Sequence, residues 1–124
     1  MTGPRIKSLV PMAHVAEIAA SAAFYAKLGF EAAASFTPPG ADSPGWMSLT
    51  SDGAELMITR ADEPVVPGQQ AVLFYLYCDD VGAMHARLCE AGLEPGPIAH
   101  PFYNPNGEFR LSDPDGYVVI VTHL

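Results

Sequence analysis

Basic residues and cysteines are scarce in this sequence. Of its 124 residues only six are Lys or Arg, against 14 Asp or Glu, and the formal net charge is −8. So few scattered cations form no stripe that could follow a phosphate backbone, which argues against a nucleic-acid partner. The two cysteines, Cys78 and Cys89, lack a CxxC spacing and are too few for a disulfide framework. We therefore expect a cytoplasmic protein with reduced thiols.

Long apolar runs and common nucleophile motifs are also missing. No stretch approaches the roughly 20 apolar residues that a bilayer crossing requires, and the opening MTGPRIKSLV lacks the features of a signal peptide. There is no Gly-rich phosphate loop, and no serine lies in a GxSxG context. A composition of 49% hydrophobic and 16% charged residues is typical of a globular protein. We expect a single domain over residues 1–124, without a membrane partner.

What the sequence does contain is an internal repeat. The segment HVAEIAASAAFYAKLGFE (14–31) aligns without a gap with YCDDVGAMHARLCEAGLE (77–94), at an offset of 63 residues. The Asp-Gly pairs at 52–53 and 115–116 keep the same offset. Self-similarity at a fixed period indicates two copies of one structural unit.

Each copy predicts the order strand, helix and three further strands. Apolar runs at 7–15 and 71–78 predict the first strands, and the Asp-Gly pairs predict hairpin turns between the last two. The expected boundaries are 1–62 for the first module, 63–70 for a Pro/Gly linker and 71–124 for the second module. The predicted fold class is therefore α+β.

The two predicted helices have recognisable ends. Glu17 and Asp80 place negative charge at the helix starts, where free N–H groups and the macrodipole favour it. Gly29 and Gly92 follow the last apolar positions, and glycine adopts the left-handed cap conformation at little cost.

Two stretches carry a family resemblance, VPMAHVAEIAASAAFYAKLGFE (10–31) and FRLSDPDGYVVIV (109–121). They resemble the signature segments of the vicinal oxygen chelate superfamily, which contains glyoxalase I, extradiol dioxygenases, fosfomycin-resistance enzymes and bleomycin-resistance proteins. The first is similar to the pattern V-x-D-x-x-x-S-x-x-FY-x-x-LGF, with Glu17 in place of the Asp, and the second contains DPDG intact. The resemblance implies two tandem βαβββ modules whose curled sheets form an open cleft, the glyoxalase/bleomycin resistance/dioxygenase fold.

The resemblance also implies a divalent metal, held by His, Glu or Gln at equivalent strand positions of the two modules. In this chain those positions carry apolar residues: Val10, Met57, Leu73 and Ile120. Thioether and aliphatic groups do not replace carboxylate and imidazole as ligands of a hard or borderline cation. We therefore predict no metal at the family position and no cofactor.

His14 and Glu55 are the candidates for a different chemistry. Alternation along a strand gives His14 the parity of Met12, and Glu55 the parity of Met57. An acid–base or hydrogen-bonding role in the cleft is therefore open for this pair. The remaining histidines share no ligand spacing: His85, His100 and His123.

The ligand-binding candidates are mostly apolar or aromatic. Inward parity, or a place in the Pro/Gly-rich segments beside the cleft, singles out Met12, His14, Trp46, Met57, Tyr75, Tyr77, Phe102 and Tyr103. Aromatic rings stack on flat or cationic molecules, and an acidic surface attracts positive charge. Because alternating strands need an apolar face in any case, a purely structural role is the competing interpretation for several of them.

The leading hypothesis is a metal-free protein similar to bleomycin-resistance proteins, which binds and sequesters an apolar, aromatic or cationic compound. An alternative is a glyoxalase-like lyase or dioxygenase-type enzyme with a shifted or metal-free active site, and a third is a structural or regulatory module without a small ligand. The family and the aromatic strand VLFYLY (72–77) also predict a homodimer, because curled sheets expose edges and apolar faces that pairing would cover.

Overall fold

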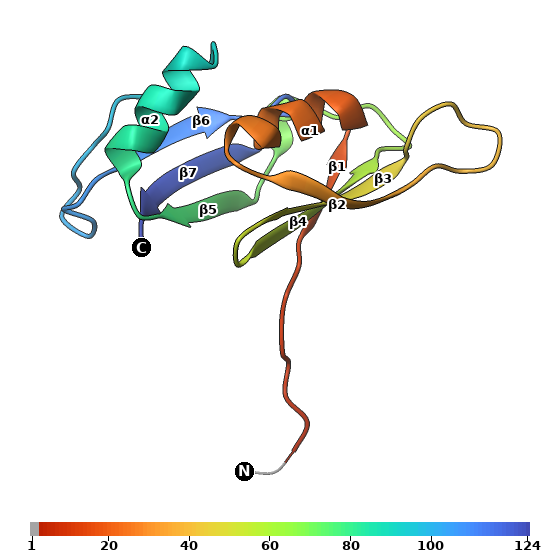
Figure 1. The fold of residues 1–124 in the computed structure, drawn as a ribbon, viewed down its shortest axis with the longest axis horizontal. Coiled ribbons are helices and arrows are strands. Elements are labelled where there is room, and N and C mark those ends of the chain that lie inside the picture. Colours follow the sequence, from red (N-terminus) through yellow and green to blue (C-terminus); the bar gives the residue numbers. More distant parts are fainter. Residues whose placement is uncertain (1–2) are drawn as a thin grey trace.

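The computed structural model describes residues 3–124 and arranges them as two sheets with one α-helix each (Figure 1). In chain order the elements are β1 (Met12–Val15), α1 (Ile18–Lys27), β2 (Glu31–Phe36), β3 (Trp46–Ser51), β4 (Ala54–Arg60), the 3₁₀ helix η1 (Pro67–Gln69), β5 (Leu73–Cys78), α2 (Val81–Glu90), β6 (Glu108–Ser112) and β7 (Val118–His123). None of the helices in this range has the length and apolar character needed to span a membrane.

The two sheets confirm the predicted α+β class and the repeat. The first has the strand order β1-β4-β3-β2 and the second the order β5-β7-β6. In each, the strand before the helix pairs in parallel with the last strand of the module, β1 with β4 and β5 with β7, and the remaining pairs are antiparallel. Both helices lie on one side of the sheets (Figure 1).

The second module forms one strand fewer than the repeat predicts. The segment corresponding to β2 approaches β6 only through an isolated bridge between Ala99 and Glu108 and a 2.7 Å hydrogen bond from the Gly96 N–H to the Arg110 carbonyl. This segment contains Pro95 and Pro97, and proline cannot donate a ladder hydrogen bond. The second sheet therefore has three strands.

The first strand is also shorter than predicted. β1 begins at Met12 instead of residue 7, directly after Pro11, which has no N–H for the ladder. Residues 3–11 leave the sheet and run away from both modules (Figure 1). Ile6 and Leu9 in this segment are 91% and 85% exposed.

Alternating strand residues place the hydrophobic core on the helix side of both sheets. Val15 and Ile58 of the first sheet and Val119 and Val121 of the second are at most 1% exposed, as is Leu88 of α2. The core is one cluster that includes residues of both modules. Because side chains alternate across a strand, the opposite face of each sheet points away from this core.

All four residues predicted to mark the helix ends lie at the ends of α1 and α2. Gly29 and Gly92 have positive φ angles of 98° and 87°, and the Asp80 carboxylate accepts a 2.9 Å hydrogen bond from the Ala83 N–H. Glu17 is the N-cap residue of α1, as predicted, but its side chain makes no capping hydrogen bond.

A polar junction holds the two modules together. At the start of α1, Asp115 accepts hydrogen bonds from the Ala16 N–H at 2.9 Å and the Ser21 hydroxyl at 3.3 Å. Tyr25 of α1 donates a 2.8 Å hydrogen bond to Asp113. The DPDG turn of the second module therefore anchors the start of the helix of the first.

The linker packs against the same turn. A Cβ atom on Gly116, whose φ is +85°, would lie 2.5 Å from the carbonyl oxygen of Pro67 in η1. Only a glycine allows this close approach. The Gln70 side-chain amide adds a 3.2 Å hydrogen bond to the Asp115 carbonyl.

Candidate functional site

The open face of the first sheet gathers four of the predicted ligand-binding residues. Strand register pairs Met12 with Met57, His14 with Thr59, and Thr59 with Trp46. Paired residues project from the same face, so these side chains are neighbours. Met12 is 49% exposed, and Met57 and Trp46 are partly exposed. The alternation that buries Val15 and Ile58 is therefore the reason this face is open.

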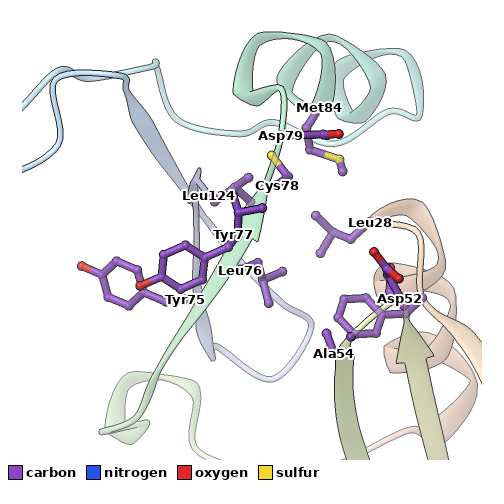
Figure 2. Close-up of a pocket in the computed structure, with 14 residues that line it drawn as sticks. Leu28, Asp52, Ala54, Tyr75, Leu76, Tyr77, Cys78, Asp79, Met84 and Leu124 are labelled. Carbon is purple, nitrogen blue, oxygen red and sulfur yellow. The ribbon is translucent and has the colours of Figure 1, made fainter.

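The open face of the second sheet carries the predicted tyrosines. Tyr75 and Tyr77 of β5 are 44% and 62% exposed, and their ring centroids lie 6.4 Å apart at an interplanar angle of 29°. Figure 2 shows both rings on the same side of β5, turned away from Leu76. Register pairs Tyr75 with Ile120 and Tyr77 with Thr122.

A polar group at the other side of this face escaped prediction. Glu108 at the start of β6 is paired with Thr122 and is only 5% exposed. Its carboxylate accepts hydrogen bonds from the Tyr103 hydroxyl at 3.4 Å and the Asn104 amide at 3.3 Å. Alternation along EFRLS, with Phe109 and Leu111 buried, could have placed Glu108 on the open face.

The loop that supplies Tyr103 crosses toward the tyrosines. Partial desolvation raises the pKa of Tyr103 above its usual value, and the charge of Glu108 and the neighbouring Tyr75 raise it further. Phe102 is 96% exposed and lies edge-on against Tyr103 at a centroid distance of 5.4 Å. Phe102 is thus at the outer rim of the face, whereas Tyr103 lies on it.

His14 and Glu55 do not converge. They belong to the same open face, but His14 is level with Thr59 and Glu55 is level with Thr50, with Met57 between. Four residues along a strand correspond to about 13 Å. Glu55 instead accepts a 3.0 Å hydrogen bond from the Ser48 hydroxyl. The arrangement does not favour a joint acid–base role.

The residues at the family metal position do not fit a divalent cation. Ile120 is fully buried, Leu73 and Met57 present only aliphatic and thioether groups, and Val10 precedes β1. Throughout residues 3–124, no three His, Cys, Asp or Glu side chains come together as a potential metal site.

A crevice separates the two modules on a different side of β5. Its volume is about 590 Å³, and it lies between the β3–β4 turn and the strand β5. Figure 2 shows Leu28 and Leu76 facing each other across it, with Asp52 at its edge. Tyr75 and Tyr77 border it through their backbone side, while their rings point the other way. The crevice and the aromatic face are therefore two distinct candidate surfaces.

The fold consists of two tandem modules, and each module is a sheet with one helix-covered face and one open face. Residues 8–121 match the Glyoxalase/Bleomycin resistance protein/Dioxygenase superfamily. The chain belongs to this superfamily. No curated protein sequence matches the chain significantly.

Solved structures with the same fold include antibiotic-binding proteins. A bleomycin-binding protein in complex with bleomycin is 19% identical, with a TM-score of 0.76 over 96% of this chain and 99% of that one. The antibiotic-binding protein TnmS3 from Streptomyces sp. CB03234 is 24% identical, with a TM-score of 0.71 over 99% and 98%. A bleomycin-binding protein from Streptomyces verticillus, in complex with copper(II)-bleomycin, is 18% identical, with a TM-score of 0.72 over 98% and 99%. At these identities the likeness establishes the shared fold.

Proposed function

We propose that this protein binds and sequesters a small aromatic or cationic organic molecule, without metal, in a cleft formed by the open sheet faces. One observation carries the proposal. Strand register arranges exposed aromatic and thioether side chains on both open faces, where the family's metal-ligand positions hold apolar residues. This combination supports stoichiometric binding over metal-assisted catalysis.

The rings provide the binding energy. Tyr75 and Tyr77 are about half exposed in the absence of ligand, so a flat molecule stacked on them would remove apolar area from water. A cation over such rings gains about 0.5–2 kcal/mol per ring. Two rings together with apolar burial are enough for micromolar affinity.

The cleft is proposed to be completed by a second copy of the chain. The open faces belong to separate sheets, so a homodimer that sets the first sheet of one subunit opposite the second sheet of its partner would enclose a ligand on both sides. The uncovered apolar side chains of Ile6 and Leu9 support this, since a second subunit would remove them from water. We place the extended segment 3–11 in that interface.

We also propose an antibiotic-like ligand and a cytoplasmic location for the protein. The similar solved proteins include binders of bleomycin and of an antibiotic, which supports an antibiotic-like ligand and a role in resistance. The free thiols of Cys78 and Cys89 support residence in the cytoplasm, where thiols stay reduced.

The test is titration of the purified protein with bleomycin and with simple aromatic amines by calorimetry. Because Trp46 is the single tryptophan, its emission reports on the first open face. We expect micromolar binding, weakened about 5- to 30-fold by Trp46→Ala and by Tyr77→Ala, which remove one ring from each face.

The control variant is Ala54→Leu, which fills the crevice between the modules and leaves both open faces intact. Its affinity should match that of the parent protein. If Ala54→Leu weakens binding while the ring variants do not, the ligand occupies the crevice and the cleft assignment is wrong. If the protein instead turns over a thiol conjugate or a diol and binds no ligand stoichiometrically, the sequestering function is wrong and the protein is an enzyme.

A further inference from the structure

Glu108 is a carboxylate in an unusual position. It lies on the open face of the second sheet, yet it is only 5% exposed, because the loop of residues 101–107 passes over it. Burying a carboxylate is costly unless donors or an opposite charge compensate it. The groups around Glu108 therefore decide what it can bind.

The hydrogen-bond donors to Glu108 are neutral, and one of them has more acceptors within reach than it has hydrogens. The Asn104 amide nitrogen has two hydrogens but three acceptors within reach: the Gly107 carbonyl, the Glu108 carboxylate and the Thr122 hydroxyl. Within residues 3–124, the only other side-chain donor to Glu108 is the Tyr103 hydroxyl, at a long 3.4 Å. An ionised carboxylate offers about four acceptor positions, so Glu108 retains unused capacity.

Glu108 receives its described hydrogen bonds from Tyr103 and Asn104 and not from Arg110, the nearest positive side chain along the strand. Arg110, two residues further along β6, lies on the same face, is exposed and is paired with Ile120 in the adjacent row. Glu108 shares its own row with Thr122 and Tyr77. Neighbouring strands are about 4.8 Å apart, so the carboxylate and the Tyr77 ring are separated by roughly the length of an aromatic amine.

We propose that Glu108 is the residue that selects the charge of the ligand: the cleft takes an aromatic compound bearing a protonated amine or guanidinium, whose ring stacks on Tyr75 and Tyr77 and whose N–H groups bind Glu108. This inference rests on the proposed sequestering function and specifies its ligand class. Binding would exchange the neutral donors Tyr103 and Asn104 for a charged one. A cationic donor adds direct Coulomb attraction to the carboxylate that a neutral donor cannot supply, which gives the exchange its direction.

The experiment uses a matched pair of probes, 1-naphthylmethylamine and 1-naphthylmethanol, at pH 7. The two have the same ring and almost the same shape, but only the amine is charged. We expect the full-length protein to bind the amine about 10- to 100-fold more tightly than the alcohol, and Glu108→Gln to remove that preference. Affinity for the alcohol should remain unchanged, which shows that the face and the 101–107 loop are intact in the variant.

Glu55→Gln is the matched control, because Glu55 is an exposed carboxylate on the other open face. It should retain the preference for the amine. Equal affinity of the parent protein for both probes, or equal weakening of both by Glu108→Gln, overturns the role of Glu108 and leaves the sequestering function standing. If only Glu55→Gln loses the preference for the amine, then Glu55 selects the charge of the ligand and the proposed role of Glu108 is wrong. If neither probe binds at millimolar concentration, the aromatic cleft itself is refuted.

Discussion

Among single residues, Asp113 has the most demanding environment. It is 5% exposed, and its carboxylate accepts hydrogen bonds from the Tyr25 hydroxyl and from the N–H groups of Asp115 and Tyr117. These bonds favour the charged form, but burial outweighs them and raises the pKa of Asp113 above its usual value. Burial and the nearby Asp113 charge also raise the pKa of Tyr25, so the hydroxyl remains a donor.

The raised pKa of Asp113 predicts a stability change with pH. An unfolded Asp loses its proton near pH 4. Above that pH the folded protein still holds the proton, so the free energy of unfolding falls as pH rises from about 4 through the folded pKa and is then constant. Asp113→Asn removes this contribution, so the stability difference between parent and variant should shrink or reverse as pH rises over that interval.

Urea unfolding at a series of pH values from 4 to 7 measures this difference. Asp62→Asn, at an exposed position directly before the linker, is the control and should change stability by the same small amount at each pH. If the parent protein gains stability over Asp113→Asn as pH rises, the sign of the pKa shift is wrong.

At the level of elements, the two helices are capped differently. α2 is capped from within its own module by Asp80, an exposed residue. α1 has no side-chain cap; its start is instead held across the module boundary by Asp115, which is 3% exposed and accepts hydrogen bonds from the Ala16 N–H and the Ser21 hydroxyl. This anchor is therefore a contact between the two modules.

Removing the cap of α2 and the anchor of α1 should have unequal effects. Asp80→Ala should lower the free energy of unfolding by about 1 kcal/mol, the usual value for an exposed N-cap. Asp115→Ala should lower it by about 3 kcal/mol, because the Ala16 N–H and the buried Ser21 hydroxyl lose their acceptor. Chemical unfolding of both variants makes the comparison, with Asp115→Asn as the conservative change that should recover part of the loss. Equal losses would show that the contact between the modules is worth no more than an exposed cap.

For the whole molecule, the exposed apolar residues are unevenly distributed. Most lie on the open sheet faces, in the loop around Phe102 and in the N-terminal segment, while the helix side is packed. A monomer would leave both the segment 3–11 and the two halves of the proposed cleft in water (Figure 1). The proposed dimer would remove both the segment and the cleft surfaces from water.

Sedimentation at micromolar concentration should therefore give a species of twice 13.2 kDa. The double variant Ile6→Asp/Leu9→Asp should weaken the dimer, because each charge would have to be buried in the interface. Ser8→Asp places a charge on a polar residue of the same segment and should leave the dimer intact. A monomeric parent protein would contradict the dimer, and an unaffected double variant would place the interface away from segment 3–11.

The sequence by itself determined the repeated architecture, because helix caps and strand periods are local properties. The Asp-Gly turns, Gly29, Gly92 and Asp80 act within a few residues of their position, and their predicted roles hold. The two strand predictions that failed are at prolines: Pro11 shortens the first strand, and Pro95 and Pro97 prevent the fourth strand of the second sheet.

Only the tertiary structure decided which side chains meet. Parity along a strand could assign Met12, Met57 and Tyr77 to open faces, but not the separation of His14 from Glu55, which depends on the register between strands. The anchoring of α1 by Asp115 joins residues 99 apart in the chain, and the burial of Glu108 depends on a loop whose path no local pattern specifies. Local chemistry selects the elements, whereas contacts between distant residues assemble the site.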